Sequence, residues 1–425
     1  MNPPSFAGLP LAPPPESKER GPLIENRSDL VIIGGGIIGL AAAVGCGRRF
    51  PDWRLLVFEK EDRVGAHQSG HNSGVIHSGL YYRPGSLKAA TCVEGAALMT
   101  AFCREHGLPL KICGKVVVAR TEQELPALQE LERRGAANGV PKLSLIGREQ
   151  LREIEPHCAG VAALHLPGTA VTDYGEVTKK LAALVESGGG QVLTGAKVIG
   201  ISQEASQIVV ETTRGAFATQ RLVNCAGLYS DRIASLAGER GARKPDALII
   251  VPFRGEYYEL ASERWHLARG LIYPVPDPKF PFLGVHFTPR VGGGVEVGPN
   301  AVLAFHREGY RRGNFRLADA MTTLGYPGFW RMAAKYWRSG CAEYYRSFNK
   351  NAFVRDARHL LPDLRQSDLR PGGSGVRAQA LDRAGKLVDD FRIHSMGNII
   401  HVLNVPSPAA TASLVIARHI AGLLG

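Results

Sequence analysis

The run DLVIIGGGIIG, which begins at Asp29, constrains the fold of this chain more than any other segment. Its apolar half is typical of a buried strand, and the glycines that follow lead into a predicted helix over residues 40–47. Gly34, Gly36 and Gly39 match the spacing G-x-G-x-x-G. In that pattern the first glycine makes a tight turn, the second admits a pyrophosphate to the backbone, and the third lets helix and strand pack closely. The segment therefore predicts a dinucleotide-binding turn, with free N–H groups at the helix N-terminus.

The next predicted strand supports this interpretation because it ends in an acidic residue. Residues 55–58 are apolar, and Glu59 follows them directly. An acid about 20 residues after the glycine turn binds the ribose hydroxyls of a dinucleotide, and Glu59 lies near that position. The alternative is a glycine-rich turn in an ordinary α/β unit, since the chain has 50 glycines. Strand, turn, helix, strand and acid occur in the expected order, which favours the dinucleotide site.

Length and composition indicate a globular protein with two structural domains. The chain has 425 residues, 44% of them hydrophobic, and no stretch of 18 apolar residues that would span a membrane. Residues 1–26 are rich in proline and lack the apolar core of a secretion signal, so we expect residues 1–27 to form a disordered tail. The seven cysteines include no C-x-x-C pair, which favours a reducing compartment over disulfide bonds or a metal site.

The formal net charge of +12 suits an acidic substrate or an anionic membrane face, and an ordinary basic surface is the simpler alternative. No nucleic-acid-binding motif accompanies the charge, so nucleic-acid binding is not expected. Residues 328–338 mix Trp, Tyr, Arg and Lys at helical spacing, as do helices that lie on a membrane surface. Such a peripheral membrane contact would give access to quinone. The alternative is a helix that packs between domains and turns a basic face to solvent.

The remaining pattern predicts a dinucleotide-binding domain built from distant parts of the chain. A buried strand over residues 222–227, and a C-terminal strand over 399–404 with a long apolar helix after it, belong with the N-terminal unit. Between them, residues 252–298 alternate in polarity, which is typical of an antiparallel sheet. The predicted fold class is therefore α/β, a Rossmann-like domain with an inserted antiparallel-sheet substrate domain. The first domain is predicted to comprise residues 28–105, 166–245 and 371–425, and the second residues 106–165 and 246–370.

Several longer motifs resemble those of a known enzyme family. They are HQSGHNSGVIHSG from His67, YYRPGSLK from Tyr81, PFRGEY from Pro252, LGVHFT from Leu283, GPNA from Gly298, GVRAQ from Gly375 and NVPSPAAT from Asn404. On these motifs the sequence resembles, over nearly its whole length after Asp29, the FAD-dependent oxidoreductases of the D-amino-acid oxidase and glycine oxidase superfamily. Within that superfamily, the resemblance is to L-2-hydroxyglutarate dehydrogenases and oxidases. Val405 departs from the pattern, in which a smaller residue is expected.

The resemblance implies FAD as the cofactor. The polar loop after Glu59 leaves the carboxyl edge of a parallel sheet, where such sheets bind ligands. Its hydroxyl and amide side chains can bind pyrophosphate or flavin atoms, and the alternative is a polar loop that caps a helix. The helix after the Pro-Ser-Pro turn can direct its N–H groups at the flavin. The expected FAD contacts are Gly34, Gly36, Ile38, Gly39, Glu59, Lys60, Gln68, Ser69, Asn72, Ser73, Gly74, Val198, Ala226, Gly227, Arg377, Asn404, Pro406 and Ser407.

The same resemblance implies oxidation of L-2-hydroxyglutarate to 2-oxoglutarate. Hydride would pass to flavin N5, and the electrons would then pass to a quinone, another carrier or dioxygen. Removal of the hydroxyl proton needs a base that titrates near neutral pH, for which His71 is the first candidate and His286 the rival. Two alternatives stay open for each, covalent attachment to the flavin and an ordinary loop histidine. His77 is expected to be structural.

Arg254 and Arg377 are candidates to bind the substrate's carboxylates, because arginine pairs with a carboxylate through two parallel N–H donors. Ordinary surface arginines are the alternative. Tyr257 is a candidate hydroxyl donor, with packing in the sheet as the alternative. Two other functions stay open, an amino-acid or amine oxidase of the same superfamily and a flavin-binding scaffold without activity. No metal is expected. The expected location is the cytoplasm or the inner face of a membrane, or the mitochondrion if the source is eukaryotic.

Overall fold

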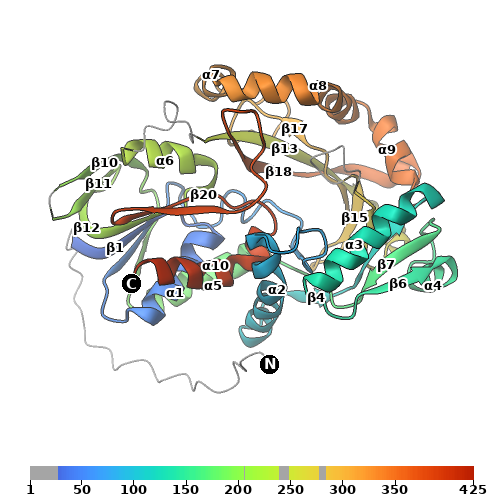
Figure 1. The fold of residues 1–425 in the computed structure, drawn as a ribbon, viewed down its shortest axis with the longest axis horizontal. Helices are drawn as coiled ribbons and strands as arrows, with labels where there is room; N and C mark the ends of the chain where they lie inside the picture. Colours follow the sequence, from blue (N-terminus) through green and yellow to red (C-terminus); the bar gives the residue numbers. More distant parts are fainter. Residues whose placement is uncertain (1–26, 205, 239–247, 277–283) are drawn as a thin grey trace.

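The computed structural model describes residues 27–204, 206–238, 248–276 and 284–425, which form two large β-sheets and a small one with helices around them (Figure 1). The predicted tail over residues 1–27 lies outside the described residues except for Arg27, which begins the first strand. None of the helices in these ranges combines the length and the apolar character that crossing a membrane requires.

The first sheet has the strand order β10-β11-β12-β1-β2-β9, with β20 beside β12 and β19 beside β20. Its central strand β1 pairs in parallel with β12 and β2. This is the predicted Rossmann-like arrangement, assembled from N-terminal, middle and C-terminal parts of the chain. The strands are β1 (Arg27–Ile33), β2 (Leu55–Phe58), β9 (Gln191–Leu193), β10 (Val198–Gln203), β11 (Ile208–Thr212), β12 (Gly215–Asn224), β19 (Arg392–Met396) and β20 (Ile399–Asn404).

Alternate residues of β1 enter two different cores, because successive side chains of a strand point to opposite faces of the sheet. Leu30 and Ile32 pack in one core with residues of α1, α2, α5 and α10. Val31 and Ile33 pack in the other with residues of α6 and of β10 to β12. Burial on both faces explains why β1 is apolar throughout its central part. The helices are α1 (Ile37–Arg49), α2 (Leu87–Glu105), α5 (Tyr174–Ser187), α6 (Ser230–Leu236) and α10 (Ala409–Leu423).

The second sheet has the strand order β17-β13-β16-β15-β14-β5-β7-β6, with β18 paired to β13. Its pairs are antiparallel, as predicted, except that β14 and β5 run parallel. A small sheet, in the order β3-β8-β4, lies apart from both. The strands are β3 (Val75–Ile76), β4 (Leu110–Ile112), β5 (Lys115–Ala119), β6 (Ser144–Gly147), β7 (Ala162–Leu166), β8 (Ala170–Thr172), β13 (Ile249–Leu260), β14 (Leu271–Pro274), β15 (His286–Pro289), β16 (Val295–Gly298), β17 (Val302–Leu303) and β18 (Leu369–Leu381).

The pairing of β13 with β18 moves one predicted boundary. The sequence placed residues 371–425 with the dinucleotide-binding domain. In the structure, β18 forms an antiparallel ladder with β13 that runs from Leu260 opposite Leu369 to Ile249 opposite Leu381. The second sheet therefore extends to Leu381, because these backbone groups satisfy each other and not the first sheet.

Five more helices surround the second sheet, among the residues that the structure describes. In Figure 1, α7 and α8 lie at the top of the molecule and α9 continues from them. Gly325 follows α7, and Pro327 opens α8 at a position where its missing N–H costs nothing. The helices are α3 (Leu125–Ala137), α4 (Arg148–Ile154), α7 (Leu317–Leu324), α8 (Pro327–Phe348) and α9 (Lys350–Arg358).

Candidate active site

Residues from both large sheets line a cavity of about 1260 Å³. From the first sheet come the turn after β1 and the end of β20, and from the second come side chains of β13, β15 and β18. Pockets for ordinary small molecules measure about 300–1,000 Å³. The cavity therefore has room for a large cofactor together with a small substrate.

The glycines of the fingerprint hold the turn after β1 close to its neighbours. Gly34 has a φ of +117°, and a Cβ atom there would lie 2.4 Å from the carbonyl oxygen of Cys225. A Cβ atom on Gly39 would lie 2.0 Å from the carbonyl oxygen of Gly34, so only glycine lets α1 begin this close to β1. Gly36 lines the cavity. The turn thus has the tight geometry that a dinucleotide-binding fingerprint requires.

Two side chains complete this end of the cavity. The Oγ atom of Ser69 accepts a hydrogen bond from the backbone N–H of Ile37 at 2.9 Å and so caps α1. Glu59 is buried, and its carboxylate accepts bonds from the N–H groups of Gly35 and Glu61, both at 2.9 Å. Ser69 and Glu59 both line the cavity. A helix N-terminus and a fixed carboxylate are the groups that a pyrophosphate and a ribose need.

Most of the predicted cofactor contacts line the cavity. They are Gly34, Gly36, Ile38, Glu59, Lys60, Gln68, Ser69, Asn72, Ser73, Val198, Ala226, Gly227, Arg377, Pro406 and Ser407. Gly39, Gly74 and Asn404 do not line it.

Each of these three residues has a structural task instead. Gly39 packs against the turn, and Gly74 has a φ of +71° with a Cβ position 2.3 Å from the carbonyl oxygen of Thr172. Asn404 is buried; its side chain accepts a bond from the N–H of Ala380 at 3.2 Å and donates one to the carbonyl of Asp390 at 2.9 Å. The three residues therefore support the backbone around the cavity, and their contact with the cofactor stays a prediction.

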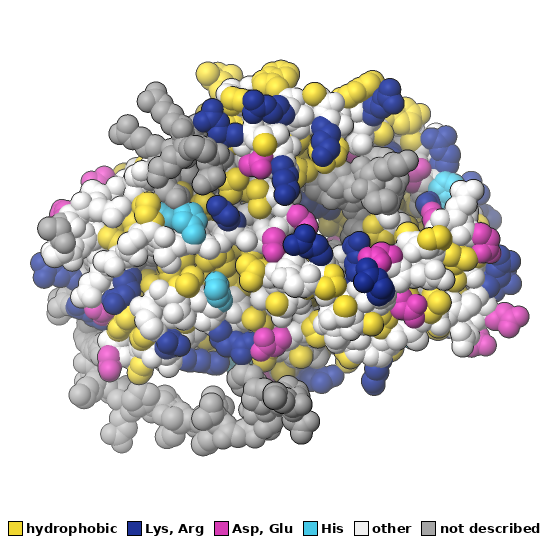
Figure 2. All heavy atoms as spheres, in the orientation of Figure 1, with side chains coloured by type: hydrophobic (Ala, Val, Ile, Leu, Met, Phe, Trp, Pro, Cys, Tyr) yellow, Lys and Arg dark blue, Asp and Glu magenta, His cyan; other side chains and the backbone are white. Residues whose placement is uncertain are grey.

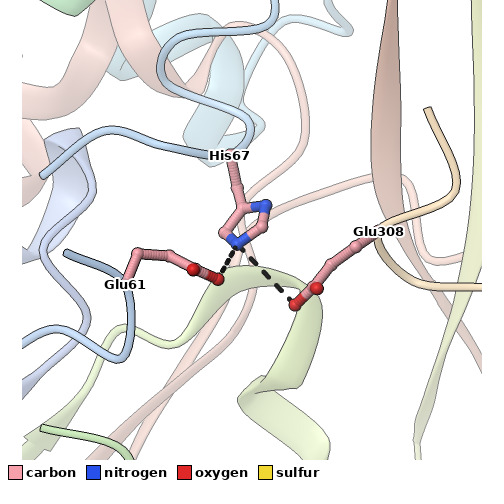
Figure 3. Close-up of side chains that lie close together, drawn as sticks. All are labelled: Glu61, His67 and Glu308. Atoms are coloured by element: carbon pink, nitrogen blue, oxygen red, sulfur yellow. Dashed lines mark hydrogen bonds and ion pairs between the residues drawn. The ribbon is translucent and has the colours of Figure 1, made fainter. Parts of the chain in front are cut away.

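A cluster of charged side chains follows Glu59 in the cavity wall (Figure 3). The Nε2 atom of His67 lies 2.8 Å from Glu61 and 3.7 Å from Glu308. These three side chains could hold a metal ion by their spacing, yet the ammonium of Lys60 contacts all three of them. Tyr229 donates a bond to Glu308 at 2.7 Å. Burial alone would raise the pKa of Glu308, but the bonds from Lys60 and Tyr229 prevail and lower it to about 2.

His286, the rival candidate base, is buried in the wall of the cavity. Its Nδ1 atom donates to the carbonyl oxygen of Gly284 at 2.8 Å, which leaves Nε2 as the acceptor. Burial lowers the pKa of His286 to about 3, and the charges of Lys115 and Arg377 act in the same direction. Tyr257 lies in the same wall, where burial raises its pKa to about 12 and the nearby Arg377 opposes that rise. A neutral imidazole, a phenol and a guanidinium therefore share this part of the cavity.

His71, the first candidate base, lies elsewhere along the cavity wall. Its Nδ1 atom lies 3.1 Å from the carbonyl oxygen of Ser374, and its ring stacks on Tyr310 at 4.2 Å between centroids. Tyr310 in turn bonds to His67 at 2.9 Å. Burial lowers the pKa of His71. His71 thus lies between Tyr310 and the backbone of β18 at Ser374 and Gly375, whereas His286 feels the charges of Lys115 and Arg377.

Arg254 faces away from the cavity, in contrast to the sequence-based expectation. Its guanidinium pairs with Glu256 at 2.9 Å and donates to the carbonyl of Arg311 at 3.2 Å. Tyr257 lies beyond Arg254 on β13, where the ladder with β18 shifts its register between Glu256 and Tyr258, and Tyr257 lines the cavity. Arg377 lies opposite Phe253 in the ladder and lines the cavity as well. Only Arg377 of the two predicted arginines lines the cavity.

Sequence reasoning missed several residues that the structure brings to this region. Glu308 reaches the cavity from the segment between β17 and α7, which has no recognisable motif, and Tyr310 of the same segment contacts His67 and His71. His77, expected to be structural, lines the cavity, and burial lowers its pKa to about 3. Lys115 lies buried beside it, and one signal was available: a lysine at the start of the run KVVVA, in an otherwise apolar strand.

Comparison with known proteins shows to which family this chain belongs. The profile of the FAD dependent oxidoreductase family, abbreviated DAO, matches residues 29–423. The chain belongs to this family. FAD is therefore its cofactor, and the tight glycine turn, the fixed Glu59 and the size of the cavity fit that cofactor. The predicted fold class, the predicted cofactor and the resemblance stated from the sequence are confirmed.

Two relatives show how far the similarity extends. The chain is 50% identical over 387 residues to the L-2-hydroxyglutarate dehydrogenase of Indibacter alkaliphilus, a match that covers 91% of this chain and 96% of that protein. It is 46% identical over 410 residues to the mitochondrial L-2-hydroxyglutarate dehydrogenase of Homo sapiens, with 92% and 88% covered.

Solved structures share the fold of this family member. The L-alpha-glycerophosphate oxidase of Mycoplasma pneumoniae, with FAD bound, superposes with a TM-score of 0.76 at 24% identity, covering 94% of each chain. The glycine oxidase of Geobacillus kaustophilus superposes with a TM-score of 0.68 at 20% identity, again covering 94% of each chain. At these identities the comparison concerns the fold alone.

Proposed function

We propose that this FAD-dependent oxidoreductase oxidises L-2-hydroxyglutarate to 2-oxoglutarate. The observation that carries the proposal is the joint placement of a neutral His286, Tyr257 and Arg377 in the wall of one cavity. The names of the relatives at 42–50% identity supply the substrate. Oxidation of a 2-hydroxy acid requires a proton acceptor for the hydroxyl group and a cation for the carboxylate, and this wall offers both.

His286 takes the hydroxyl proton at Nε2. The bond from Nδ1 to Gly284 fixes the ring and its tautomer, so that Nε2 keeps a free lone pair at neutral pH. An isolated base with a pKa of about 3 is weak, but a bound dicarboxylate brings negative charge that raises the pKa of the imidazole in the complex. FAD, when bound, supplies the hydride acceptor at flavin N5.

Arg377 holds a substrate carboxylate. Its guanidinium lies on the cavity face of β18, and its charge reaches both Tyr257 and His286. Two parallel N–H donors give such a pair orientation as well as affinity. Tyr257 keeps its phenolic proton at neutral pH and is therefore a hydrogen-bond donor to the substrate.

The test is an anaerobic titration of the purified holoprotein with both enantiomers of 2-hydroxyglutarate, read at the visible band of the flavin. We expect bleaching by the L form. Glycine, sarcosine and common amino acids serve as the comparison, because an amine or amino-acid oxidase shares the same cofactor site. Bleaching by an amine, or by the D form alone, would overturn the assignment of substrate. Bleaching by none of these compounds would favour a flavin-binding scaffold.

We further propose that the face formed by α7 and α8 contacts an anionic membrane and so reaches quinone, with another carrier or dioxygen as the alternative acceptor. Figure 2 shows hydrophobic and basic side chains together at the top of the molecule, where these helices lie. Trp330 and Trp337 are each 59% exposed and Phe348 is 73% exposed. Basic residues such as Arg331 and Lys335 alternate with them, a composition typical of helices at a membrane surface.

Vesicle flotation tests this contact. We expect the protein to float with vesicles that contain phosphatidylglycerol and not with vesicles of phosphatidylcholine alone. The double variant Trp330→Ser and Trp337→Ser is expected to stay at the bottom, whereas Trp265→Ser, which removes an exposed tryptophan from another part of the surface, still floats. Absence of flotation in low salt would end the proposal. The proposed location would then be the cytoplasm, or the mitochondrion if the source is eukaryotic, rather than the inner face of a membrane.

A further inference from the structure

Lys115 is a buried cation outside the wall of the cavity. It begins β5, its side chain is 3% exposed, and every other residue of β5 is buried as well. None of the ion pairs among the described residues includes it. Taking an ammonium group out of water without a carboxylate partner is costly, and a protein gains stability when such a group is replaced by an apolar one. A charge retained at this cost is therefore expected to serve the function of the site.

Two tyrosine rings hold the ammonium in place. The Nζ atom lies 4.4 Å from the centroid of the Tyr81 ring and 3.7 Å from that of Tyr273. Contacts between a cation and aromatic faces offset part of the desolvation cost. The titratable group on the neighbouring helix α2 is the Cys92 thiol, whose pKa burial raises to about 12. The thiol is thus uncharged at neutral pH and does not neutralise Lys115.

Tyr273 also connects Lys115 with His286. The strand order β15-β14-β5 places Tyr273 between the strands that carry His286 and Lys115. The rings of Tyr273 and His286 stack at 3.9 Å between centroids and at 26° between planes. The ammonium of Lys115 and the imidazole of His286 thus both contact the ring of Tyr273 and reach it from opposite neighbouring strands.

The charge of Lys115 acts on both histidines of this region. It lowers the pKa of His286 and that of His77, in each case in addition to the larger effect of burial. The other charged or titratable groups that face His286 are Arg377 on β18 and His77 on the segment after β3. No carboxylate among the described residues contributes to either shift. Burial lowers the pKa of Lys115 itself to about 7, so its charge is present below that pH. There the region is cationic, and an imidazole in it keeps its lone pair.

We propose that Lys115 is a positioning residue, whose ammonium, seated against Tyr273, adds to the effect of burial in keeping His286 unprotonated and makes this end of the cavity attractive to an anionic substrate. The proposal rests on the proposed function for the identity of that substrate. The effect of Lys115 on His286 does not depend on the proposed function, because this effect is present in the protein without substrate.

The first test uses the wild-type holoprotein without substrate. Histidine labelled with carbon-13 at Cε1 is followed by NMR from pH 8 down to the lowest pH at which the protein stays folded, with His286 and His77 assigned from the spectra of His286→Asn and His77→Asn. We expect neither signal to titrate above pH 5. A titration of His286 near the ordinary value of about 6.5 would overturn the proposal, and this measurement needs no variant of Lys115.

The second test compares Lys115→Met with Lys111→Met, which removes an exposed lysine from the neighbouring strand β4. Methionine is unbranched like lysine, is one atom shorter, and lacks the charge. In Lys115→Met we expect the pKa of His286 to rise by about one pH unit. The pH below which flavin reduction slows should rise by the same amount. We also expect binding of 2-oxoglutarate to weaken about tenfold, since one nearby cation is lost. Lys111→Met should change none of these quantities.

The outcomes separate the two proposals. If Lys115→Met leaves the titration of His286 unchanged, the role of Lys115 is refuted, whatever the substrate. If L-2-hydroxyglutarate fails to reduce the wild-type flavin while the titration moves as expected, the proposed function is refuted and the action of Lys115 on His286 stands.

Discussion

The ammonium of Lys60 lies 2.5 Å from a carboxylate oxygen of Glu308, although the two residues are 248 positions apart in the chain. Lys60 follows β2 of the first sheet, and Glu308 lies in the segment between β17 and α7. Tyr229 donates a hydrogen bond to the same carboxylate from the short helical turn after β12. These contacts tie the segment after β17 of the second sheet to the carboxyl end of β2 in the first, beside the buried Glu59.

Glu308→Gln is expected to destabilise the protein by about 2 kcal/mol at pH 7, because it removes charge-assisted hydrogen bonds that are largely shielded from water. The pKa of Glu308 is about 2 in the folded protein and near 4.5 when unfolded, so this contribution is complete above pH 4.5 and is lost as the pH falls toward 2. Urea unfolding of wild type and variant from pH 7 to pH 3.5 should therefore show a gap that narrows below pH 4.5. Glu176→Gln, in an exposed pair with Lys179, is the control and should have no measurable effect.

Arg377→Met and Arg254→Met should have contrasting effects. Arg377 lines the cavity, so its loss is expected to weaken binding of 2-oxoglutarate about 100-fold with little change in stability. Arg254 is buried in a pair with Glu256, so its loss is expected to destabilise the fold by about 3 kcal/mol and to leave the binding constant nearly unchanged. Spectral titration of the flavin and urea unfolding measure the two quantities. Weaker binding in Arg254→Met than in Arg377→Met would contradict the assignment.

His286→Asn and His71→Asn test which histidine accepts the proton. Asparagine can keep the hydrogen bond to Gly284 through its amide but has no equivalent of Nε2, so we expect the rate of flavin reduction in His286→Asn to fall by a factor of about 10²–10⁴. His71 stacks on Tyr310, and its replacement should change that rate only a few-fold. Single-turnover measurements under anaerobic conditions give both rates. The opposite ranking would restore His71 as the base.

The burial of Lys115 is expected to make the free energy of unfolding depend on pH. Burial lowers the pKa of Lys115 to about 7, below its unfolded value of about 10.4, so between these values the unfolded chain binds the extra proton. Stability should therefore rise with pH in wild type relative to Lys115→Met, by up to about 1.4 kcal/mol for each pH unit between pH 7 and pH 9. At pH 7 the variant is expected to be the more stable of the two. Urea unfolding at pH 7, 8 and 9 measures the difference in the free energy of unfolding. If this difference does not change with pH, the lowered pKa of Lys115 is contradicted.

The sequence did not show which residues of β13 face the cavity. A regular strand directs residues three positions apart to opposite faces. The ladder of β13 and β18 shifts its register between Glu256 and Tyr258, so this alternation does not extend from Arg254 to Tyr257 by rule. The folded cavity decides it, because Tyr257 and Arg377 line the cavity and Arg254 does not.

The sequence by itself determined the glycine turn, the acid after β2 and the family, because these depend on residues close together in the chain and on motifs of fixed spacing. Only the tertiary structure decided that Lys60 meets Glu308, that Lys115 and His286 share the ring of Tyr273, and that the charge of Arg377 acts on His286. Contacts of this second kind join residues far apart in the chain, and they depend on strand order and on the packing of one sheet against another. Local periodicity carries no information about either.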